Sequence, residues 1–219
     1  MNKKLIAACL SLALVGATVL GTMAWLTDRD EVKNTFTVGN VEIKVDETDV
    51  DTEGNPTGGD RVQENEYHLI PGCTYTKDPT MTVKAGSVES YARMILTVHN
   101  ASAVQAIIDN YNLGDFSALI DGWDEELWLY HGFTEDTAAN TISFEFRYKY
   151  IIPATDTDLV LAPLFTELVV PGEVTAEELQ DLYDGTGAFQ MNVVGHAIQT
   201  AGFDSEDAAW VAFDQQVES

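Results

Sequence analysis

The chain has 219 residues, of which 36 are acidic and 11 are basic, and its formal net charge at pH 7 is -25. A surface this acidic repels phosphate backbones and anionic lipids, which argues against nucleic acid and acidic membranes as partners. The hydrophobic share of 45% is typical of a globular chain and argues against general disorder.

The first 24 residues have the pattern of a secretory signal peptide. Lys3 and Lys4 precede an apolar run over 5–20, and small residues close the segment. We expect cleavage between Ala24 and Trp25, and therefore a protein that is secreted to the extracellular matrix or the cell surface. An uncleaved membrane anchor is the alternative, but the apolar run is shorter than the roughly 20 residues that span a bilayer.

Cleavage would leave one cysteine, Cys73, because Cys9 lies within the signal. No intramolecular disulfide would then be available, so packing and hydrogen bonds must stabilise the protein.

Residues 25–35 follow the signal as a polar, extended arm that is too polar to form its own core. Such an arm can add as a strand to an exposed sheet edge on a neighbouring molecule. Leu26, Val32 and Phe36 are the side chains that we expect to fix its register. A disordered tail that leads into the first strand is the alternative. We expect residues 36–219 to form a single domain.

Residues 46–66 are acidic, rich in glycine and proline, and predicted to form a surface loop. Within this loop, Asp49, Asp51, Glu53 and Asp60 match oxygen-donor positions of a calcium-binding loop. A proline inside the loop and strands on both sides weaken the match. Calcium is the one cofactor that the sequence suggests, and the alternative is a solvated acidic loop.

Alternating patterns predict strands along most of the remaining chain. Shorter segments predict helices: one capped by Ser102, one opened by a capping box at Thr175, and one after Ser205 whose Trp210 and Phe213 pack on the body. The predicted class is mainly β, an antiparallel jelly-roll-like sandwich with short helices inserted in the connections. The predicted strands cover residues 41–45, 67–70, 80–84, 90–99, 127–133, 141–151 and 188–199.

The aromatic ladder from Ile142 to Tyr150 has two interpretations. Alternate large residues on one face of a strand are typical of core packing, and they also suit a ligand-binding aromatic strip. The polar residues between them are expected to face water.

Three segments together resemble the TasA and camelysin family of Gram-positive spore-formers. They are an Asn-x-Phe-x-x-Gly-x-Val run after the signal, a Pro-Gly, Lys-Asp-Pro and Tyr-x-Arg pattern, and an Ala-Ile-Gln signature near the C-terminus. The matching residues are Asn34, Phe36, Gly39, Val41, Pro71, Gly72, Lys77, Asp78, Pro79, Tyr91, Arg93 and those of residues 195–203.

The resemblance implies a jelly-roll subunit of an extracellular, biofilm-type fibre, in which an N-terminal strand completes the sheet of the next subunit. It further implies export through a dedicated signal peptidase. Its expected partners are other copies of the same chain and an accessory matrix protein, and not nucleic acid. Residues 100–140 match no motif of the family.

Camelysins have been classed as metallopeptidases, so an enzyme is an alternative interpretation. His68, His99, His131 and His196 are scattered, and none belongs to the His-Glu-x-x-His pattern that places two zinc ligands on one helix face. We therefore expect a non-enzymatic protein without catalytic residues. A camelysin-like cell-surface metallopeptidase remains one alternative, and a monomeric module that recognises polysaccharide or host protein is another.

Overall fold

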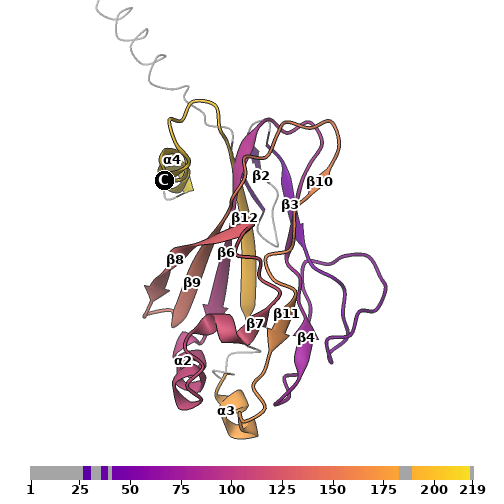
Figure 1. The fold of residues 1–219 in the computed structure, drawn as a ribbon, viewed down its shortest axis with the longest axis vertical. Helices are drawn as coiled ribbons and strands as arrows, with labels where there is room; N and C mark the ends of the chain where they lie inside the picture. The colour runs from indigo at the N-terminus through magenta and orange to yellow at the C-terminus, as the bar shows by residue number, and fades with distance from the viewer. Residues whose placement is uncertain (1–26, 31–35, 39–40, 183–188, 218–219) are drawn as a thin grey trace, which may run out of the picture.

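The computed structural model describes residues 27–30, 36–38, 41–182 and 189–217 (Figure 1). All described strand pairings are antiparallel, and short helices lie in the connections. The predicted mainly β, antiparallel class is confirmed, and the layered arrangement is compatible with a jelly roll. None of the helices in these ranges is both long and apolar enough to span a bilayer.

One large sheet contains six strands in the order β2-β1-β12-β6-β9-β8, and two three-stranded sheets have the orders β10-β5-β3 and β4-β11-β7. The strands are β1 (Thr27–Asp30), β2 (Phe36–Val38), β3 (Ile43–Asp46), β4 (Thr74–Thr76), β5 (Thr80–Val83), β6 (Ser90–His99), β7 (Ile120–Asp121), β8 (Trp128–Asp136), β9 (Thr141–Tyr148), β10 (Leu159–Val160), β11 (Glu167–Val169) and β12 (Met191–Gln199).

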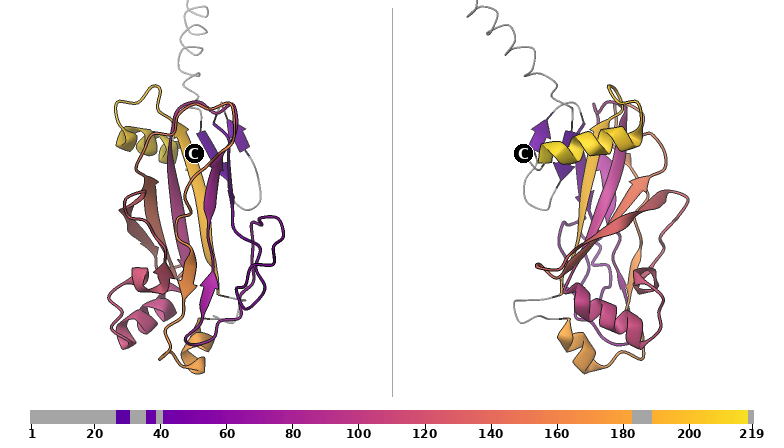
Figure 2. Two further views of the ribbon diagram at one scale, coloured as in Figure 1. Left: turned by 45° about the vertical axis from the view of Figure 1, so that its right-hand side comes forward. Right: turned by 90° about the vertical axis from the view of Figure 1, so that its left-hand side faces the viewer.

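The main core lies between the large sheet and the two small sheets (Figure 2). Met94, Leu96 and Val98 alternate along β6 and are fully buried there. Ile43 of β3 and Met81 of β5 approach them from the facing layer. β6 pairs with β12 on one side and β9 on the other. Its inner face packs in the main core, and on its outer face Tyr91 packs against the cluster of Trp210 and Phe213, which explains why both faces carry large side chains.

The helices cover the ends and the outer face of this sandwich. α2 (Ala101–Asn110), the short 3-10 helix η1 (Phe116–Leu119) and α3 (Ala176–Asp181) lie at the lower end in Figure 1. α4 (Glu206–Val217) lies across the outer face of the large sheet (Figure 2). As predicted, the Ser205 hydroxyl accepts a hydrogen bond from the amide of Ala208 at the start of α4.

A second, smaller core lies under α4. Trp210 and Phe213 are almost fully buried against Ile198 of β12, as the sequence predicted for the two aromatic residues. The capping box of α3 is confirmed too, because the Thr175 hydroxyl and the Glu178 carboxylate each bond the other's backbone amide.

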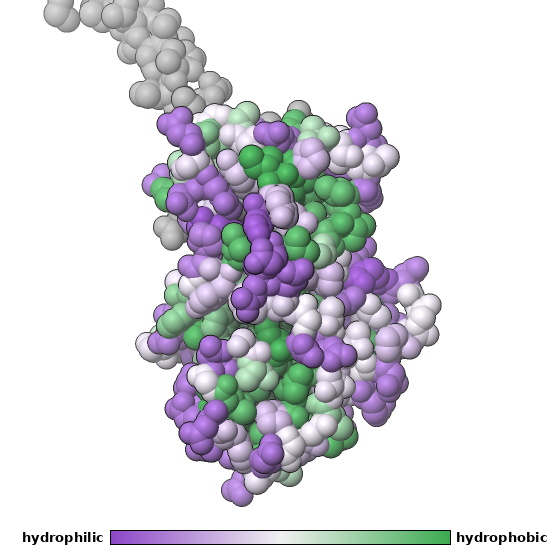
Figure 3. All heavy atoms as spheres, viewed as in Figure 1, coloured by the Kyte–Doolittle hydropathy of each residue, from purple (hydrophilic) through white to green (hydrophobic). Residues whose placement is uncertain are grey.

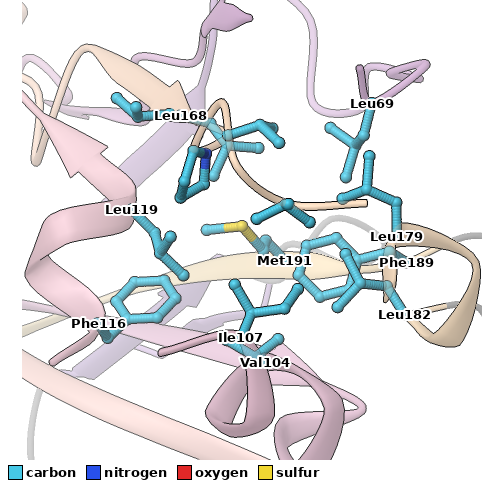
Figure 4. A pocket seen from close by; sticks show the side chains of 14 residues that line it. Leu69, Val104, Ile107, Phe116, Leu119, Leu168, Leu179, Leu182, Phe189 and Met191 are labelled. Atoms are coloured by element: carbon cyan, nitrogen blue, oxygen red, sulfur yellow. The ribbon is translucent and has the colours of Figure 1, made fainter. Parts of the chain in front are cut away.

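At the lower end of the main core, apolar side chains surround a small pocket of about 40 Å³ (Figure 4). Val104 and Ile107 of α2, Leu179 beside them and Met191 of β12 are among its lining residues. A space of this size without polar side chains is a packing void rather than a ligand site.

The strand predicted over Tyr67–Ile70 is wrong, because tyrosine side chains satisfy the backbone of this segment. The Tyr75 hydroxyl donates to the His68 carbonyl and accepts from the Ile70 amide, at 2.7 Å in both cases. The Tyr67 hydroxyl donates to the Thr76 carbonyl. These bonds replace a strand ladder, and the regular strand forms later, at β4.

The predicted cap of α2 is also wrong. The helix begins two residues earlier than a cap at Ser102 would place it, and Asn100, with a φ of 51°, is the N-cap. The amide of Ser102 is satisfied instead by the side chain of Asn140, 3.0 Å away. A contact between residues 38 positions apart leaves no local signal in the sequence.

Candidate assembly site

The N-terminal strand β1 lies between two other strands of its own chain. It pairs antiparallel with β12, where Thr27 lies opposite Ile198, and with β2, where Thr27 lies opposite Val38. We call this position, bounded by β12 and β2, the β1 slot. Four residues of the predicted arm therefore occupy a place inside the large sheet.

The described residues of β1 pair with part of their long neighbour. β12 is paired with β6 along all nine of its residues, whereas β1 pairs only with the four residues from Gly195 to Ile198. The sequence of β1, Thr-Asp-Arg-Asp, has no apolar residue. The strand is therefore held through its backbone ladder rather than through a hydrophobic face of its own.

Gly195 sets the distance between β12 and the facing sheet. A Cβ atom at this position would overlap the Cγ2 of Val45 and lie 2.9 Å from the Cε of Met81. The glycine thus allows the two layers to approach closely directly beneath the strand pair of the slot. In the register of the sheet, Gly195 lies opposite Asp30 of β1.

Arg93 fixes α4 against the outer face of the sheet next to the slot. Its guanidinium lies over the rings of Trp210 and Phe213, at 4.5 and 5.1 Å from the ring centroids. Its Nε donates to Nδ1 of His196, 3.1 Å away on β12, and its terminal nitrogens pair with Asp214 of α4. The Arg93 side chain is only 5% exposed, so its ring contacts are shielded from water, whereas its partner Asp214 is half exposed.

Two of the segments that carry the family resemblance lie side by side in the fold. Tyr91 and Arg93 of β6 are the register partners of Ile198 and His196 of β12. The Tyr-x-Arg and Ala-Ile-Gln segments are about 100 residues apart in the sequence, and the sheet makes them adjacent.

The Lys-Asp-Pro segment anchors the acidic loop to the sandwich. Lys77 and Glu47 form an ion pair at 2.8 Å in which both side chains are 8% exposed. Asp78 accepts from the amide and hydroxyl of Thr48 and pairs with Arg61. Burial alone would raise the pKa of Asp78, but the hydrogen bonds from Arg61 and Thr48 hold it below its usual range.

Three of the four candidate calcium ligands, Asp49, Asp51 and Glu53, accept hydrogen bonds within this loop. Asp51 accepts from the amides of Glu53 and Asn55 through one carboxylate oxygen, and Asp49 accepts from the Thr57 hydroxyl. Asp60 is exposed. Among the residues that the structure describes, no cluster of three or more His, Cys, Asp or Glu could hold a metal. Calcium binding stays a prediction, which calorimetry with calcium would test.

The four histidines lie on separate parts of the fold. His68 lies in the loop before β4, and His131 is exposed on β8. His99, at the end of β6, lies 3.2 Å from the side chain of Asn192, and His196 is buried beneath α4 against Phe213. The structure therefore does not bring two of them together as a zinc peptidase would require.

The remaining predicted site residues lie at the edge of what the structure describes. The predicted signal peptide, its cleavage residues Ala24 and Trp25, and the arm residues Leu26 and Val32 fall outside the described residues. Phe36 begins β2, and in the register of the sheet it lies opposite Arg29.

The fold and the slot define a class: an antiparallel β-sandwich whose N-terminal strand fills a position in its large sheet. Residues 1–77 match the family model described as camelysin metallo-endopeptidase. This match confirms the resemblance to the TasA and camelysin family. It covers the signal-like segment, the strands β1 and β2, and the acidic loop. No curated protein and no solved structure matches the chain.

Proposed function

We propose that the protein is a structural subunit that builds an extracellular fibre by exchanging β1 between copies. In the fibre, β1 of one molecule leaves its own slot and pairs with β12 and β2 of the next molecule. The observation that carries this proposal is the position of β1, a short polar strand held between two strands of one sheet.

Exchange of this kind costs little free energy, because the same backbone contacts form within one chain and between chains. At about 0.5–1.5 kcal/mol net per hydrogen bond, a four-residue strand is held by only a few kcal/mol. Local opening of the slot is therefore accessible without unfolding of the sandwich.

The connection after β1 limits how two subunits can be arranged. Residues 31–35 join β1 to β2, and a fully extended chain of five residues spans at most about 18 Å. A donated β1 must therefore reach a slot within that distance of the donor's own β2. Adjacent subunits in the fibre would be in direct contact, without a long flexible linker.

Processing of the N-terminus would make β1 available. Cleavage between Ala24 and Trp25 would leave two residues before β1, so the exchanged strand would begin almost at the new N-terminus. The protein would act outside the cell, in the matrix or at the cell surface. Its partners would be other copies, a dedicated signal peptidase and an accessory matrix protein that starts or ends the fibre.

Electron microscopy of protein that lacks residues 25–34 tests the proposal. We expect fibres from protein that begins at Trp25 and none from the deletion variant. As a matched control, Phe133→Ala on β8 alters the other end of the large sheet, where we expect no effect on fibres. Undiminished fibres from the deletion variant would remove β1 from the mechanism.

A second candidate function is that of a camelysin-like metallopeptidase, which the description of the matched family favours. It predicts azocasein hydrolysis by purified, zinc-loaded protein and loss of that activity on chelation. Activity that is lost in a His68→Ala, His99→Ala or His131→Ala variant would establish an enzyme and identify a ligand. Equal turnover in zinc-loaded and chelated samples would end this alternative.

A further inference from the structure

A second feature lies at the opposite end of the large sheet from the β1 slot. A groove of about 720 Å³ runs between the β8–β9 hairpin and the segment from α2 through η1 to Trp123. Its volume is within the range of about 300–1,000 Å³ that small-molecule sites occupy. Figure 3 shows hydrophobic surface in the lower half of the molecule, surrounded by hydrophilic residues.

Aromatic rings form the floor and the walls of this groove. Phe144 and Phe146 of β9 lie on the floor, where Phe116 stacks on Phe144 at 4.9 Å and Trp123 meets Phe146 edge-on at 5.3 Å. Tyr130 and Phe133 of β8 are 47% and 55% exposed and present free ring surface. Phe144 and Phe146, from the aromatic ladder predicted on β9, thus form the floor, and the exposed rings come from β8.

A β-bulge places both exposed rings on the groove side of β8. Tyr130 and Phe133 are three residues apart and would lie on opposite faces of a regular strand. The register shifts between Tyr130 and Gly132, so Tyr130 lies opposite Phe146 and Phe133 lies opposite Phe144. Gly132 permits this with a φ of 116°, a conformation that other residues rarely adopt.

The rim of the groove carries charge of one sign. Asp115, Glu125, Glu135 and Asp136 line it, and none of the described residues that line it is basic. Hydrogen bonds from the hydroxyl and amide of Ser117 lower the pKa of Asp115, so this carboxylate stays charged in weak acid. Burial, and then the charge of Asp115, raise the pKa of Tyr130, which keeps the phenol protonated as a hydrogen-bond donor.

The backbone around the groove disfavours a peptide as its occupant. β9 is paired on both sides, with β6 and with β8, so the floor has no free strand edge. The bulge and the carboxylates of Glu135 and Asp136 interrupt the outer edge of β8. A peptide would therefore bring backbone amides and carbonyls onto an aromatic floor that cannot bond them.

We propose that this groove binds a polysaccharide that carries free amino groups. The apolar faces of its sugar rings lie on Tyr130, Phe133 and Phe144, and its ammonium groups pair with the acidic rim and the aromatic faces. Its hydroxyls remain at the open side in water. This site is independent of strand exchange, because it lies at the other end of the sheet and uses no residue of the β1 slot.

Calorimetry with chitosan oligosaccharides, which carry free amines, tests this proposal on the purified protein. We expect binding that weakens with salt, and weaker binding of the fully N-acetylated oligosaccharides. The double variant Tyr130→Ala/Phe133→Ala should lose about tenfold or more in affinity. Tyr150→Ala is the control, because Tyr150 is 54% exposed and does not line the groove.

Both substituted residues are exposed, so we expect the double variant to fold with an unchanged thermal midpoint. Equal affinity of the wild type and the double variant would overturn the proposal. So would binding of oligolysine with no binding of chitosan oligosaccharides, which would assign the groove to basic peptides. Absence of binding to either probe would overturn it as well.

Discussion

Near one end of the six-stranded sheet, β1 joins β12 through four polar residues, whereas at the other end β8, which carries three aromatic residues, joins β9 in a long hairpin. The first end offers a backbone ladder formed by a strand whose sequence has no apolar residue. The second offers rings and carboxylates, and its edge is interrupted by a bulge. Under the proposed function, β1 near the first end is the strand that is exchanged, and the bulge at the other end disfavours strand addition there.

The largest expected effect comes from a proline in β1. Asp28→Pro removes a backbone donor from the slot strand, and we expect it to abolish fibres in negative-stain images. The sandwich should still fold, because its described core is built from other strands and from the helices. As a control, Phe133→Lys alters β8 at the other end of the sheet, and it should leave fibres unchanged. Loss of fibres in both variants would contradict the expectation that fibre formation depends on β1 and not on β8.

Gly195→Val tests the close approach of the layers beneath the slot. The new side chain would overlap Val45 and Met81, so we expect a loss of about 1–3 kcal/mol in the free energy of unfolding, measured with urea. Asn192→Val, at an exposed position of the same strand, should change it by less than about 0.5 kcal/mol. Similar losses in the two variants would refute the role of Gly195.

Arg93→Met tests whether α4 is held by the arginine beside the slot. Loss of the ring contacts and of the bond to His196 should destabilise the protein by about 1–2 kcal/mol. Amide exchange should then accelerate in α4 and not in the β8–β9 hairpin. Arg93→Lys keeps the charge without the planar guanidinium, so its stability should lie between that of the wild type and that of Arg93→Met. Uniform acceleration across the sheet would contradict this local role.

The smallest expected effect is a dependence on acid. A hydrogen bond and the charge of Arg147 lower the pKa of Asp207, so this contact between α4 and β9 is favourable above the ordinary carboxyl pKa. It is lost as pH falls through the lowered value in the folded protein. Asp207 is exposed, so the change in stability is small and Asp207→Asn should remove it. An identical acid titration of α4 in the variant, followed by NMR, would contradict this assignment.

Regular alternation made the central strands predictable. The limits of β6 agree with the sequence pattern, and β9 starts where predicted and ends three residues earlier. The capping box of α3 and the aromatic residues of α4 followed from equally local patterns. In each case the signal lies within about ten neighbouring residues.

Features that depend on distant residues were not predictable. The pairing of β1 with β12 joins positions about 170 residues apart, and β1 has no hydrophobic pattern that indicates a partner. The polar face of β9 was expected to meet water, but the Arg147 side chain is only 12% exposed beneath α4, where it pairs with Glu145 and Asp207. The spacing of Tyr130 and Phe133 conceals their shared face, and only the dipeptide His-Gly between them hints at a bulge.

Cross-linking between two different single-cysteine variants tests strand exchange most directly. In a Cys73→Ser background, one protein carries Asp28→Cys and the other Ala197→Cys, because these residues are register partners across the slot. We predict that fibres grown from the mixture form disulfide-linked heterodimers, and that Asp28→Cys mixed with Leu129→Cys on β8 forms none. Fibres that contain no linked Asp28→Cys and Ala197→Cys chains would contradict the exchange of β1 between subunits.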